Sequence, residues 1–166
     1  GCNQGRAYAF IASGKNKCNA YALPKFGKFS GENSVANPDS GDYTIVIGTD
    51  DSTSGQVDVY QGTKTGTGLE IDKAGLTNGT LAGIKVEANP AITGNLESGQ
   101  INGTFSTGVV DTSVNGAAQQ ANSHGGGITE FARPEDGAGA DVKTCYFVTS
   151  GADPDGKGAM GMKPSR

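Results

Sequence analysis

The chain has 166 residues, enough for a single domain with a hydrophobic core. Its composition, with 28 Gly, 34% hydrophobic residues and no Trp, is typical of a turn-rich β protein rather than a helical or disordered one. The net charge of −4 and the absence of a basic stripe argue against a nucleic-acid partner. No apolar run is long enough for a transmembrane helix, so no membrane span is expected.

The first predicted element is a hairpin over residues 6–23, with its turn at residues 13–16. Cys2 and Cys18 flank this hairpin, and either a disulfide across it or two ordinary thiols fit their positions. Cys2 lies in a polar Gly-rich turn and is also a candidate thiolate ligand for a metal. Cys145 lies in an apolar run and is predicted to be a buried, inert thiol.

Three runs with β-branched residues or apolar–polar alternation predict one antiparallel sheet, at residues 44–47, 56–60 and 80–86. A turn at residues 49–55 joins the first two runs, and a long polar connection joins the second and third. With a short strand at residues 35–36 they make a four-stranded unit of about 55 residues, the size of one propeller blade.

The segment 89–127 is rich in Gly, Asn, Ser and Thr, and only residues 100–106 read as a strand. It is predicted to be a long insertion or loop with weak structure.

The predicted fold is therefore all-β, a partial β-propeller domain of antiparallel four-stranded blades. Residues 24–88 would form one blade, and residues 128–166 would start another, with a strand at 143–149. Because one and a half blades leave sheet edges open, we expect an excerpt of a longer protein, or a subunit completed by partners. The first residues carry no signal peptide, so one has been removed or the chain starts within a larger protein.

Glu32 and Glu135 open two stretches that repeat each other. From each glutamate a Tyr follows after eleven residues, a Gly after sixteen and an Asp after eighteen. The next residues, Asn33 and Asp136, also match in kind. An internal repeat built on an acid, a strand and a Gly turn is typical of radial or stacked β units. The repeat predicts equivalent strand positions for the two glutamates.

Four strings of residues carry more information than composition. In chain order they are Leu23-Pro24-Lys25-Phe26-Gly27-Lys28-Phe29-Ser30-Gly31-Glu32-Asn33, Gly55-Gln56-Val57-Asp58-Val59-Tyr60-Gln61-Gly62-Thr63-Lys64-Thr65, Lys73-Ala74-Gly75-Leu76-Thr77-Asn78-Gly79-Thr80-Leu81 with Gly83-Ile84-Lys85-Val86, and Phe131-Ala132-Arg133-Pro134-Glu135-Asp136-Gly137 with Tyr146-Phe147-Val148-Thr149. Their order and amino-acid sequences resemble those of bacterial secreted β-propellers related to PhoX-type alkaline phosphatases and phytase-like esterase propellers. The resemblance runs over residues 19–87 and 128–166. It departs at Ala138, where relatives have Trp, and at Ala82, where they have an aromatic residue.

The resemblance implies a portion of a secreted metal-dependent phosphoesterase-like propeller, located outside the cell, in the periplasm or at the cell surface. In that family a central funnel holds calcium and iron ions that bind and activate a phosphate monoester. By resemblance Arg133 and Glu135 are the candidate catalytic residues, and Arg133 would contact the phosphate because a guanidinium pairs bidentately with phosphate oxygens. Glu32, Glu135 and Asp136 are the candidate metal ligands, since hard cations prefer carboxylates.

A second function stays open at this point. The chain would then be a noncatalytic, calcium-binding extracellular propeller with a structural or assembly role at the cell surface or in a filament. Its partners would be further blades or other copies of itself, rather than a phosphate monoester or another anion. In this interpretation Glu32 and Glu135 cap turns or pair with nearby Arg and Lys. Iron together with calcium would favour the enzyme, and calcium alone the structural role.

Local chemistry adds three smaller expectations. Pro134 fixes its own φ and biases Arg133 toward an extended conformation, which predicts a rigid placement of the Arg133 side chain. Residues 50–52 and 153–158 are predicted to be polar turns, with calcium sites as the alternative. His124 is predicted to be an exposed loop histidine.

Overall fold

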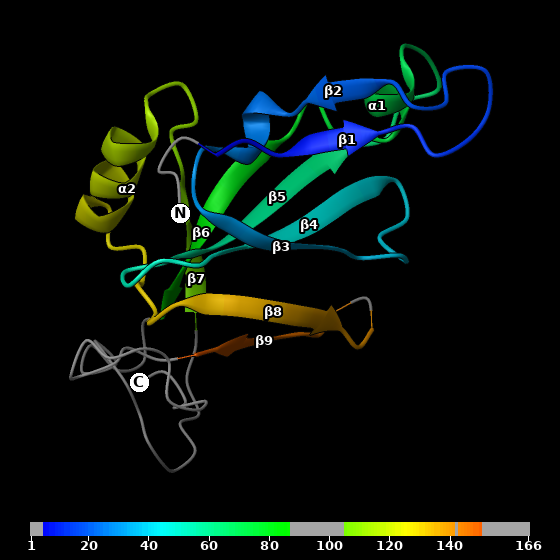
Figure 1. Cartoon of the computed structure of the whole chain (residues 1–166). Coiled ribbons are helices and arrows are strands. Elements are labelled where there is room, and N and C mark those ends of the chain that lie inside the picture. Colours follow the sequence, from blue (N-terminus) through cyan, green and yellow to red (C-terminus); the bar gives the residue numbers. More distant parts are fainter. Residues whose placement is uncertain (1–4, 87–104, 142, 151–166) are drawn as a thin grey trace.

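The structure is a computed structural model that describes residues 5–86, 105–141 and 143–150 (Figure 1). Its centre is a five-stranded antiparallel sheet in which every strand lies beside the next one along the chain. The strands are β3 (Gly31–Ala36), β4 (Tyr43–Asp50), β5 (Val57–Thr63), β6 (Thr80–Val86) and β7 (Phe105–Val109). The expected all-β, antiparallel class is confirmed.

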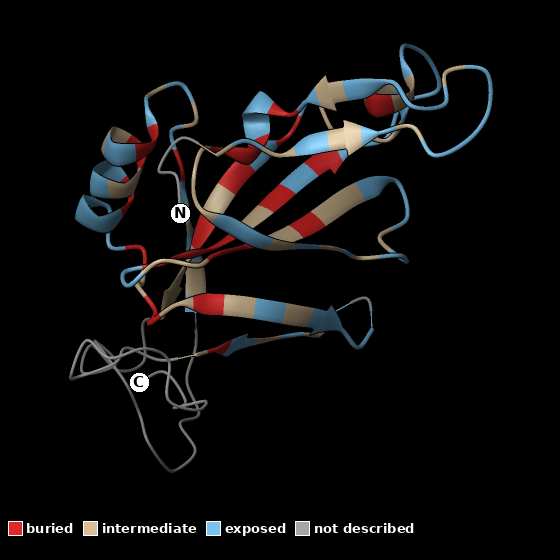
Figure 2. Cartoon of the chain, viewed as in Figure 1, coloured by how far each residue is buried: buried red, intermediate tan, exposed pale blue. Residues whose placement is uncertain are grey.

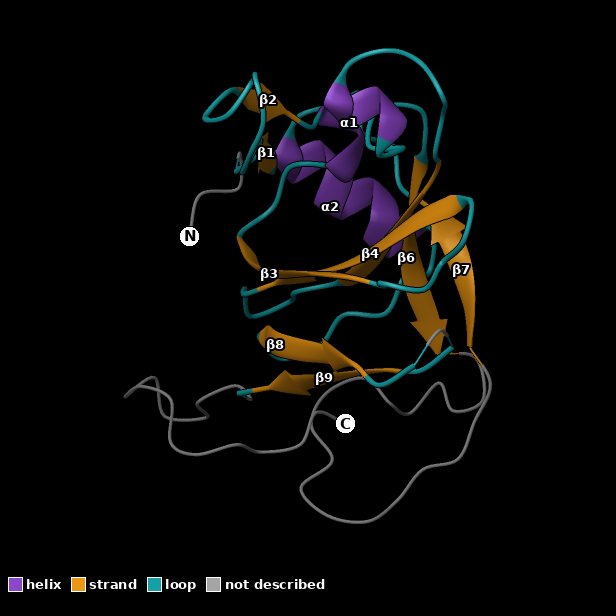
Figure 3. Cartoon of the chain, turned by 90° about the vertical axis from the view of Figure 1, so that its right-hand side faces the viewer, coloured by secondary structure: helices purple, strands orange, loops and turns teal. Residues whose placement is uncertain are grey.

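Two small antiparallel hairpins and three short helices surround this central sheet. One hairpin pairs β1 (Tyr8–Phe10) with β2 (Ala20–Ala22), and the other pairs β8 (Pro134–Gly139) with β9 (Cys145–Thr149). The helices are the 3₁₀ turn η1 (Pro24–Phe26), α1 (Glu70–Lys73) and α2 (Gly116–Gly125). Figure 3 shows the β1–β2 hairpin and α2 on one side of the sheet and the β8–β9 hairpin on the other. The arrangement is layered, with the central sheet in the middle.

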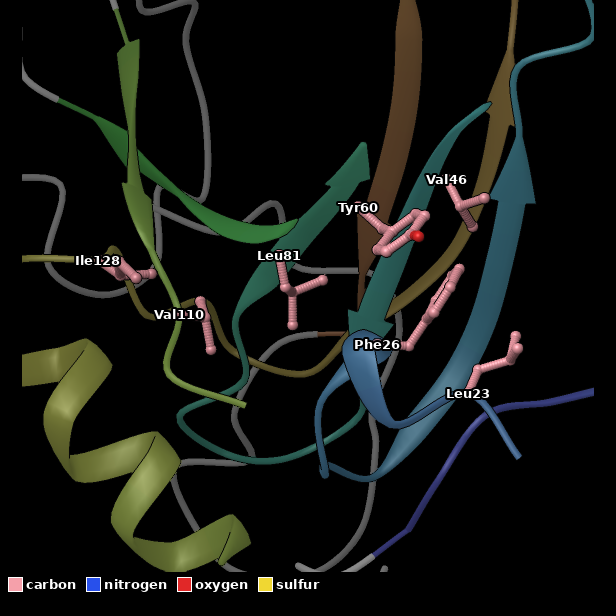
Figure 4. Close-up of a cluster of buried hydrophobic side chains, with 7 residues drawn as sticks. All are labelled: Leu23, Phe26, Val46, Tyr60, Leu81, Val110 and Ile128. Carbon is pink, nitrogen blue, oxygen red and sulfur yellow. The ribbon is translucent and has the colours of Figure 1, made fainter. Parts of the chain in front are cut away.

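The hydrophobic core lies between the central sheet and the layer that carries the β1–β2 hairpin, η1 and α2 (Figure 4). Phe26 of η1 stacks on Tyr60 of β5 with ring centroids 4.0 Å apart. Tyr60 is fully buried, and its hydroxyl donates to the Gly75 carbonyl and accepts from the Gly79 N–H. Five aliphatic residues complete the cluster: Leu23, Val46, Leu81, Val110 and Ile128. A single Tyr therefore anchors the core and fixes the turn that leads into β6.

The end of β4 and the start of β5, on either side of the turn that joins them, are covered on both faces of the sheet. Buried residues follow one another without alternation at 48–50 and again at 55–58 (Figure 2). Strand side chains point to opposite faces in turn, so continuous burial requires a neighbouring layer on each face. This doubly covered corner places polar side chains, among them Asp50 and Asp58, inside the molecule.

The predicted strands at residues 44–47, 56–60 and 80–86 lie in one antiparallel sheet, as expected. The predicted N-terminal hairpin is also present. The sheet has five strands rather than the expected four, because β7 pairs with β6 from within the predicted insertion. The short strand expected at residues 35–36 is the end of the longer β3.

The expectation of weak structure across residues 89–127 is wrong for the part that the structure describes. That part contains β7 and the ten-residue helix α2. The residues of α2 that face the core are small or polar, namely Gly116, Gln119 and Ser123, so the helix carries no apolar stripe that would reveal it. Its beginning is fixed by Asn115, whose side chain accepts from the Ala118 N–H at 2.9 Å.

The cysteines differ in their surroundings. Cys18 is a free, exposed thiol with a left-handed backbone, φ +71°, whereas Cys2 lies outside the described residues. Cys145 is a free, half-buried thiol at the start of β9, and burial raises the pKa of this thiol above its usual value. The predicted turn at residues 153–158 lies outside the described residues.

Strands β7 and β9 are among those that display large apolar side chains to solvent. β7 is the last strand in the order of the central sheet, among the described residues, and Phe105 and Val109 on it are 67% and 81% exposed. Tyr146 and Val148 of β9 are 64% and 44% exposed. Both pairs alternate with residues that are less exposed, as expected for strands with one solvent-facing side.

Candidate functional site

The candidate site lies where the two repeated stretches meet. Glu32 is the second residue of β3, Glu135 is the second residue of β8, and each strand is the first of an antiparallel hairpin. Strands β3 and β8 lie beside each other (Figure 1). The side-chain amide of Asn33 donates to the carboxylate of Asp136, so the two matching residues of the repeat contact one another. The predicted equivalence of the glutamates on their strands is confirmed.

Both glutamates also sit at irregularities in their ladders. The β3–β4 register shifts between Gly31 and Asn33, and the β8–β9 register shifts between Pro134 and Gly137. A bulge re-aims side chains and commonly occurs at functional sites. Each glutamate is therefore placed where the strand departs from regular pairing.

The second strands of the two hairpins do not keep the equivalence. Ser34 pairs with Gly48, whereas its counterpart Gly137 pairs with Phe147, the counterpart of Thr44. Strand β9 is thus displaced by four residues relative to β4. The matched spacing from glutamate to Tyr, Gly and Asp consequently describes equivalent sequence positions but not equivalent strand pairs.

Arg133 is the centre of the site. Its Nε donates to Oδ1 of Asp51 at 2.8 Å, and Nη2 donates to Oδ2 of the same carboxylate at 3.2 Å. Nη2 also lies 2.9 Å from Oε1 of Glu135. Hydrogen bonding to Asp51, together with the negative charges of Asp51, Glu135 and Glu32, raises the pKa of Arg133 above its usual value. Glu135 therefore pairs directly with the guanidinium, whereas Glu32 on the neighbouring strand contributes only a weaker charge effect.

The backbone of Arg133 differs from the expectation. It is left-handed, with φ +57°, rather than extended. Its N–H donates to the carbonyls of Ser52 and Phe131, and its own carbonyl accepts from the Ser150 N–H at 3.1 Å. These three bonds hold a conformation that few non-Gly residues adopt. The tertiary hydrogen bonds override the local preference set by Pro134, and the placement of the side chain remains rigid.

Glu135 is held as firmly as Arg133. Its Oε1 accepts from the hydroxyl of Ser150 at 2.6 Å, and its backbone carbonyl accepts from the hydroxyl of Thr49. The side chain is 29% exposed, so it reaches the surface beside the equally accessible Arg133. Asp51 is 25% exposed. The ion pairs at this site are therefore partly shielded from water rather than fully solvated.

The carboxylates of the site have the donor chemistry that calcium prefers, because all are hard oxygen ligands. Within the described parts of the chain, however, no three His, Cys, Asp or Glu side chains are arranged to hold a metal ion. Two of these carboxylates are already partly engaged: Oε1 of Glu135 contacts Arg133 and Ser150, and Oδ1 of Asp136 accepts from Asn33 and from the Gly137 N–H. As they stand, Glu32, Glu135 and Asp136 supply donors of the right kind but not a complete ligand set.

Asp51 is the functional residue whose role sequence reasoning missed. Residues 50–52 were expected to form a polar turn; Asp50 is instead the buried last residue of β4, and the turn begins after it at Asp51. The bridge between Gly55 and Phe131 brings this turn against the segment that carries Arg133. That contact joins positions far apart in the sequence, so the polar turn alone gave no signal of a partner for Arg133.

A second pair of acids lies deeper in the same corner. Asp50 is 5% exposed, and its carboxylate accepts from the Ser30 N–H and the Ser52 hydroxyl, both at 3.1 Å. Asp58 is 3% exposed, and its Oδ1 has no hydrogen-bond partner. Burial, and then the nearby charge of Asp50, raise the pKa of Asp58 to about 7. Burial likewise raises the pKa of Asp50.

His124 lies at the end of α2 rather than in a loop, and its side chain is 67% exposed, as predicted. Its Nδ1 is 3.2 Å from the Glu130 carboxylate. The Glu130 carboxylate also accepts from the side-chain amide of Gln120 at 3.1 Å, and the same amide donates to the Ser54 carbonyl at 2.7 Å. Among the described helices none is both long and apolar enough to cross a bilayer.

Comparisons of the chain with protein-family models, with curated proteins and with solved structures gave no match.

Proposed function

We propose that this chain is part of a secreted, metal-dependent phosphoesterase-like β-propeller that acts on a phosphate monoester. The observation that supports this function is the convergence of the repeat on one guanidinium. Glu135 is ion-paired with Arg133, and Glu32 acts on the same Arg133 from the adjacent strand. A scaffold ion pair needs only one acid, whereas a site that binds both an anion and a cation needs several charged groups at one place.

In this function Arg133 binds the phosphoryl group. Its fork of N–H donors matches two phosphate oxygens as well as it matches the two oxygens of Asp51. Asp51 orients the guanidinium before the substrate arrives. The left-handed backbone, held by three hydrogen bonds, limits the positions that the side chain can take.

The carboxylates of Glu32, Glu135 and Asp136 would contribute to binding of calcium, with iron as a second metal. Such a cation would polarise the phosphoryl group and lower the pKa of a bound water. The remaining ligands would come from further blades of the same protein, which would also complete the propeller. Because the acids around Arg133 outnumber it, phosphate binding is expected to require the cation.

A second candidate function is the noncatalytic, calcium-binding extracellular propeller with a structural or assembly role. The observation that favours it is the bidentate pairing of Arg133 with Asp51. That pair ties the turn after β4 to the start of β8, which is what a scaffold ion pair does. The two functions differ in whether Arg133 exchanges Asp51 for a phosphate oxygen.

The test compares Glu135→Gln with the matched control Glu130→Gln, which removes a glutamate outside the site. Calcium binding is measured by calorimetry, iron by metal analysis after reconstitution, and hydrolysis with p-nitrophenyl phosphate. The proposed phosphoesterase predicts that Glu135→Gln lowers metal content and hydrolysis together, whereas Glu130→Gln changes neither.

Calcium binding without iron and without hydrolysis would favour the noncatalytic function instead. Metal content and activity that are the same in Glu135→Gln and the parent chain would leave Glu135 a scaffold residue and would contradict both metal-binding functions at this site.

A further inference from the structure

A cavity of about 350 Å³ opens between the N-terminal segment, η1 and the β3–β4 hairpin. Its apolar lining includes Phe26, Val46 and Leu81, which belong to the core cluster drawn in Figure 4. Arg6 and Glu32, both exposed residues, line its polar side. The cavity therefore has an apolar interior and a charged rim, the usual character of a small-molecule site.

The wall of the cavity toward β4 carries no side chain at Gly48. Phe29 also lines the cavity, and a Cβ atom at Gly48 would stand 3.1 Å from the Cζ atom of Phe29. The tip of the Phe29 ring thus approaches the bare backbone of β4. A wall made of an aromatic ring and bare backbone suits a planar apolar group better than a branched or strongly polar one.

The cavity is connected to the Arg133 site through two structural links. Glu32 belongs to both, because it lines the cavity and its charge acts on Arg133. The segment at the rim is also bonded to the acids of the site: the Ser30 N–H donates to Asp50, and the Asp51 N–H donates to the Ser30 carbonyl at 2.9 Å. Asp51 in turn holds Arg133. Residues 30–32 thus contact both the cavity and the acids that hold Arg133.

We propose that the cavity holds the organic group of the phosphate ester and that this group is a single apolar ring, which makes the substrate an aryl or benzyl phosphate. This inference rests on the proposed phosphoesterase function. The volume agrees with it, since an apolar cavity of roughly 150 Å³ already admits benzene and pockets for larger ligands range from about 300 to 1,000 Å³. A nucleotide or a sugar would place many polar groups against Phe26, Val46 and Leu81, where they would lose their hydrogen bonds to water.

The test uses Ser34→Phe, which adds a ring at an exposed position of β3 that lines the cavity. The matched control is Thr107→Phe, which adds the same ring at an exposed position of β7 outside it. Phenol is titrated into the metal-free chain, and NMR signals of the methyl groups of Val46 and Leu81 are followed. We expect these signals to shift on titration. Ser34→Phe should weaken phenol binding by about tenfold or more, because the added ring keeps the phenol ring from being buried in the cavity. Thr107→Phe should bind phenol as the parent chain does.

A second titration compares phenyl phosphate with inorganic phosphate in the presence of calcium. Phenyl phosphate should bind about tenfold more tightly, and Ser34→Phe should remove the difference without weakening binding of inorganic phosphate. Phosphate binding that is the same for both anions, together with no phenol shifts, would overturn the cavity assignment and leave the proposed function standing. Phenol binding with no binding of either anion would instead overturn the ester assignment together with the phosphoesterase function.

Discussion

Arg133 shows how much one residue of this chain depends on its neighbours. Its side chain is fixed by a bidentate bond to Asp51, and its backbone is held in the left-handed region by bonds to Ser52, Phe131 and Ser150. Such a conformation persists only when the surroundings determine it from several directions. The residue is therefore a sensitive probe of whether the corner around it is correctly formed.

Replacing Arg133 by Lys should destabilise the chain although the charge is kept. An ammonium group cannot make the two parallel bonds that the guanidinium makes with Asp51, and the loss of one partly shielded charged bond costs about 1–2 kcal/mol. Urea unfolding followed by circular dichroism measures the change. Arg6→Lys is the matched control and should leave the unfolding midpoint in place; an equal loss in both variants would show that the Asp51 pairing contributes nothing.

Asp58 should make the stability of the chain fall as pH rises. Its pKa is raised to about 7 in the folded chain by burial and by Asp50, while an unfolded Asp titrates near 4. The folded chain then holds a proton that the unfolded chain has released, so the free energy of unfolding decreases between about pH 4 and pH 7 and levels off above. A difference of three pKa units corresponds to roughly 4 kcal/mol.

Asp58→Asn should remove most of this slope, because Asn does not ionise. Unfolding is measured in urea at pH 5 and at pH 8, and the variant is expected to gain on the parent chain at pH 8. The control is Asp39→Asn, which changes an exposed residue of the β3–β4 turn and should keep the parent's slope. A slope in Asp58→Asn equal to that of the parent chain would contradict the assignment to Asp58.

At the scale of elements, the strands were easier to predict than the helix. Tyr43–Asp50 and Val57–Thr63 carry β-branched and aromatic residues that mark strands in any context. Helix α2 has Ala and Gln, which favour helices, but its buried positions are Gly116, Gln119 and Ser123. Without an apolar stripe, its composition matches that of a polar loop. The strand predicted at residues 100–106 overlaps the start of β7, but β7 continues to Val109, and its apolar residues Phe105 and Val109 face solvent.

The cap of α2 should account for a measurable part of its stability. Asn115→Ala removes the acceptor for the Ala118 N–H and leaves that donor without its partner, at a cost of about 1 kcal/mol. Asn122→Ala is the matched control at an exposed position inside the helix, where Ala is the better helix former and no loss is expected. Thermal unfolding of both variants, measured in parallel, checks the prediction. A lower melting temperature for Asn122→Ala than for Asn115→Ala would contradict it.

At the scale of the molecule, the docking of the β8–β9 hairpin decides whether the site exists. Arg133, Glu135 and the repeat with Glu32 could be identified from the sequence, because charged residues next to Pro and a repeated spacing are local features of the chain. It did not reveal Asp51, because this contact depends on the bridge between Gly55 and Phe131. Long-range docking of this kind leaves no periodic trace in a sequence. The repeat likewise predicted the place of the glutamates but not the displaced register of β9.

Gly55 is the point at which this docking is most easily disturbed. A Cβ atom there would lie 1.9 Å from the carbonyl oxygen of Asp50 and 2.5 Å from the Cδ atom of Pro134. Both are backbone or ring atoms that cannot move aside, so Gly55→Ala should cost about 3 kcal/mol or more. Gly66→Ala, which meets no atom within 4 Å, is the control and should be close to neutral. Chemical denaturation of the two variants compares them, and equal midpoints would mean that the hairpin is not packed against the turn.

The exposed apolar residues of β7 have a consequence for how the chain behaves at high concentration. An edge strand that presents Phe105 and Val109 on one side can act as a template on which another molecule extends the sheet. Refolding should therefore compete with aggregation, and the yield of monomer should fall as the protein concentration rises. A positive charge between the two apolar residues, as in Thr107→Lys, acts as a gatekeeper against such growth and should raise the soluble yield without altering the folded chain.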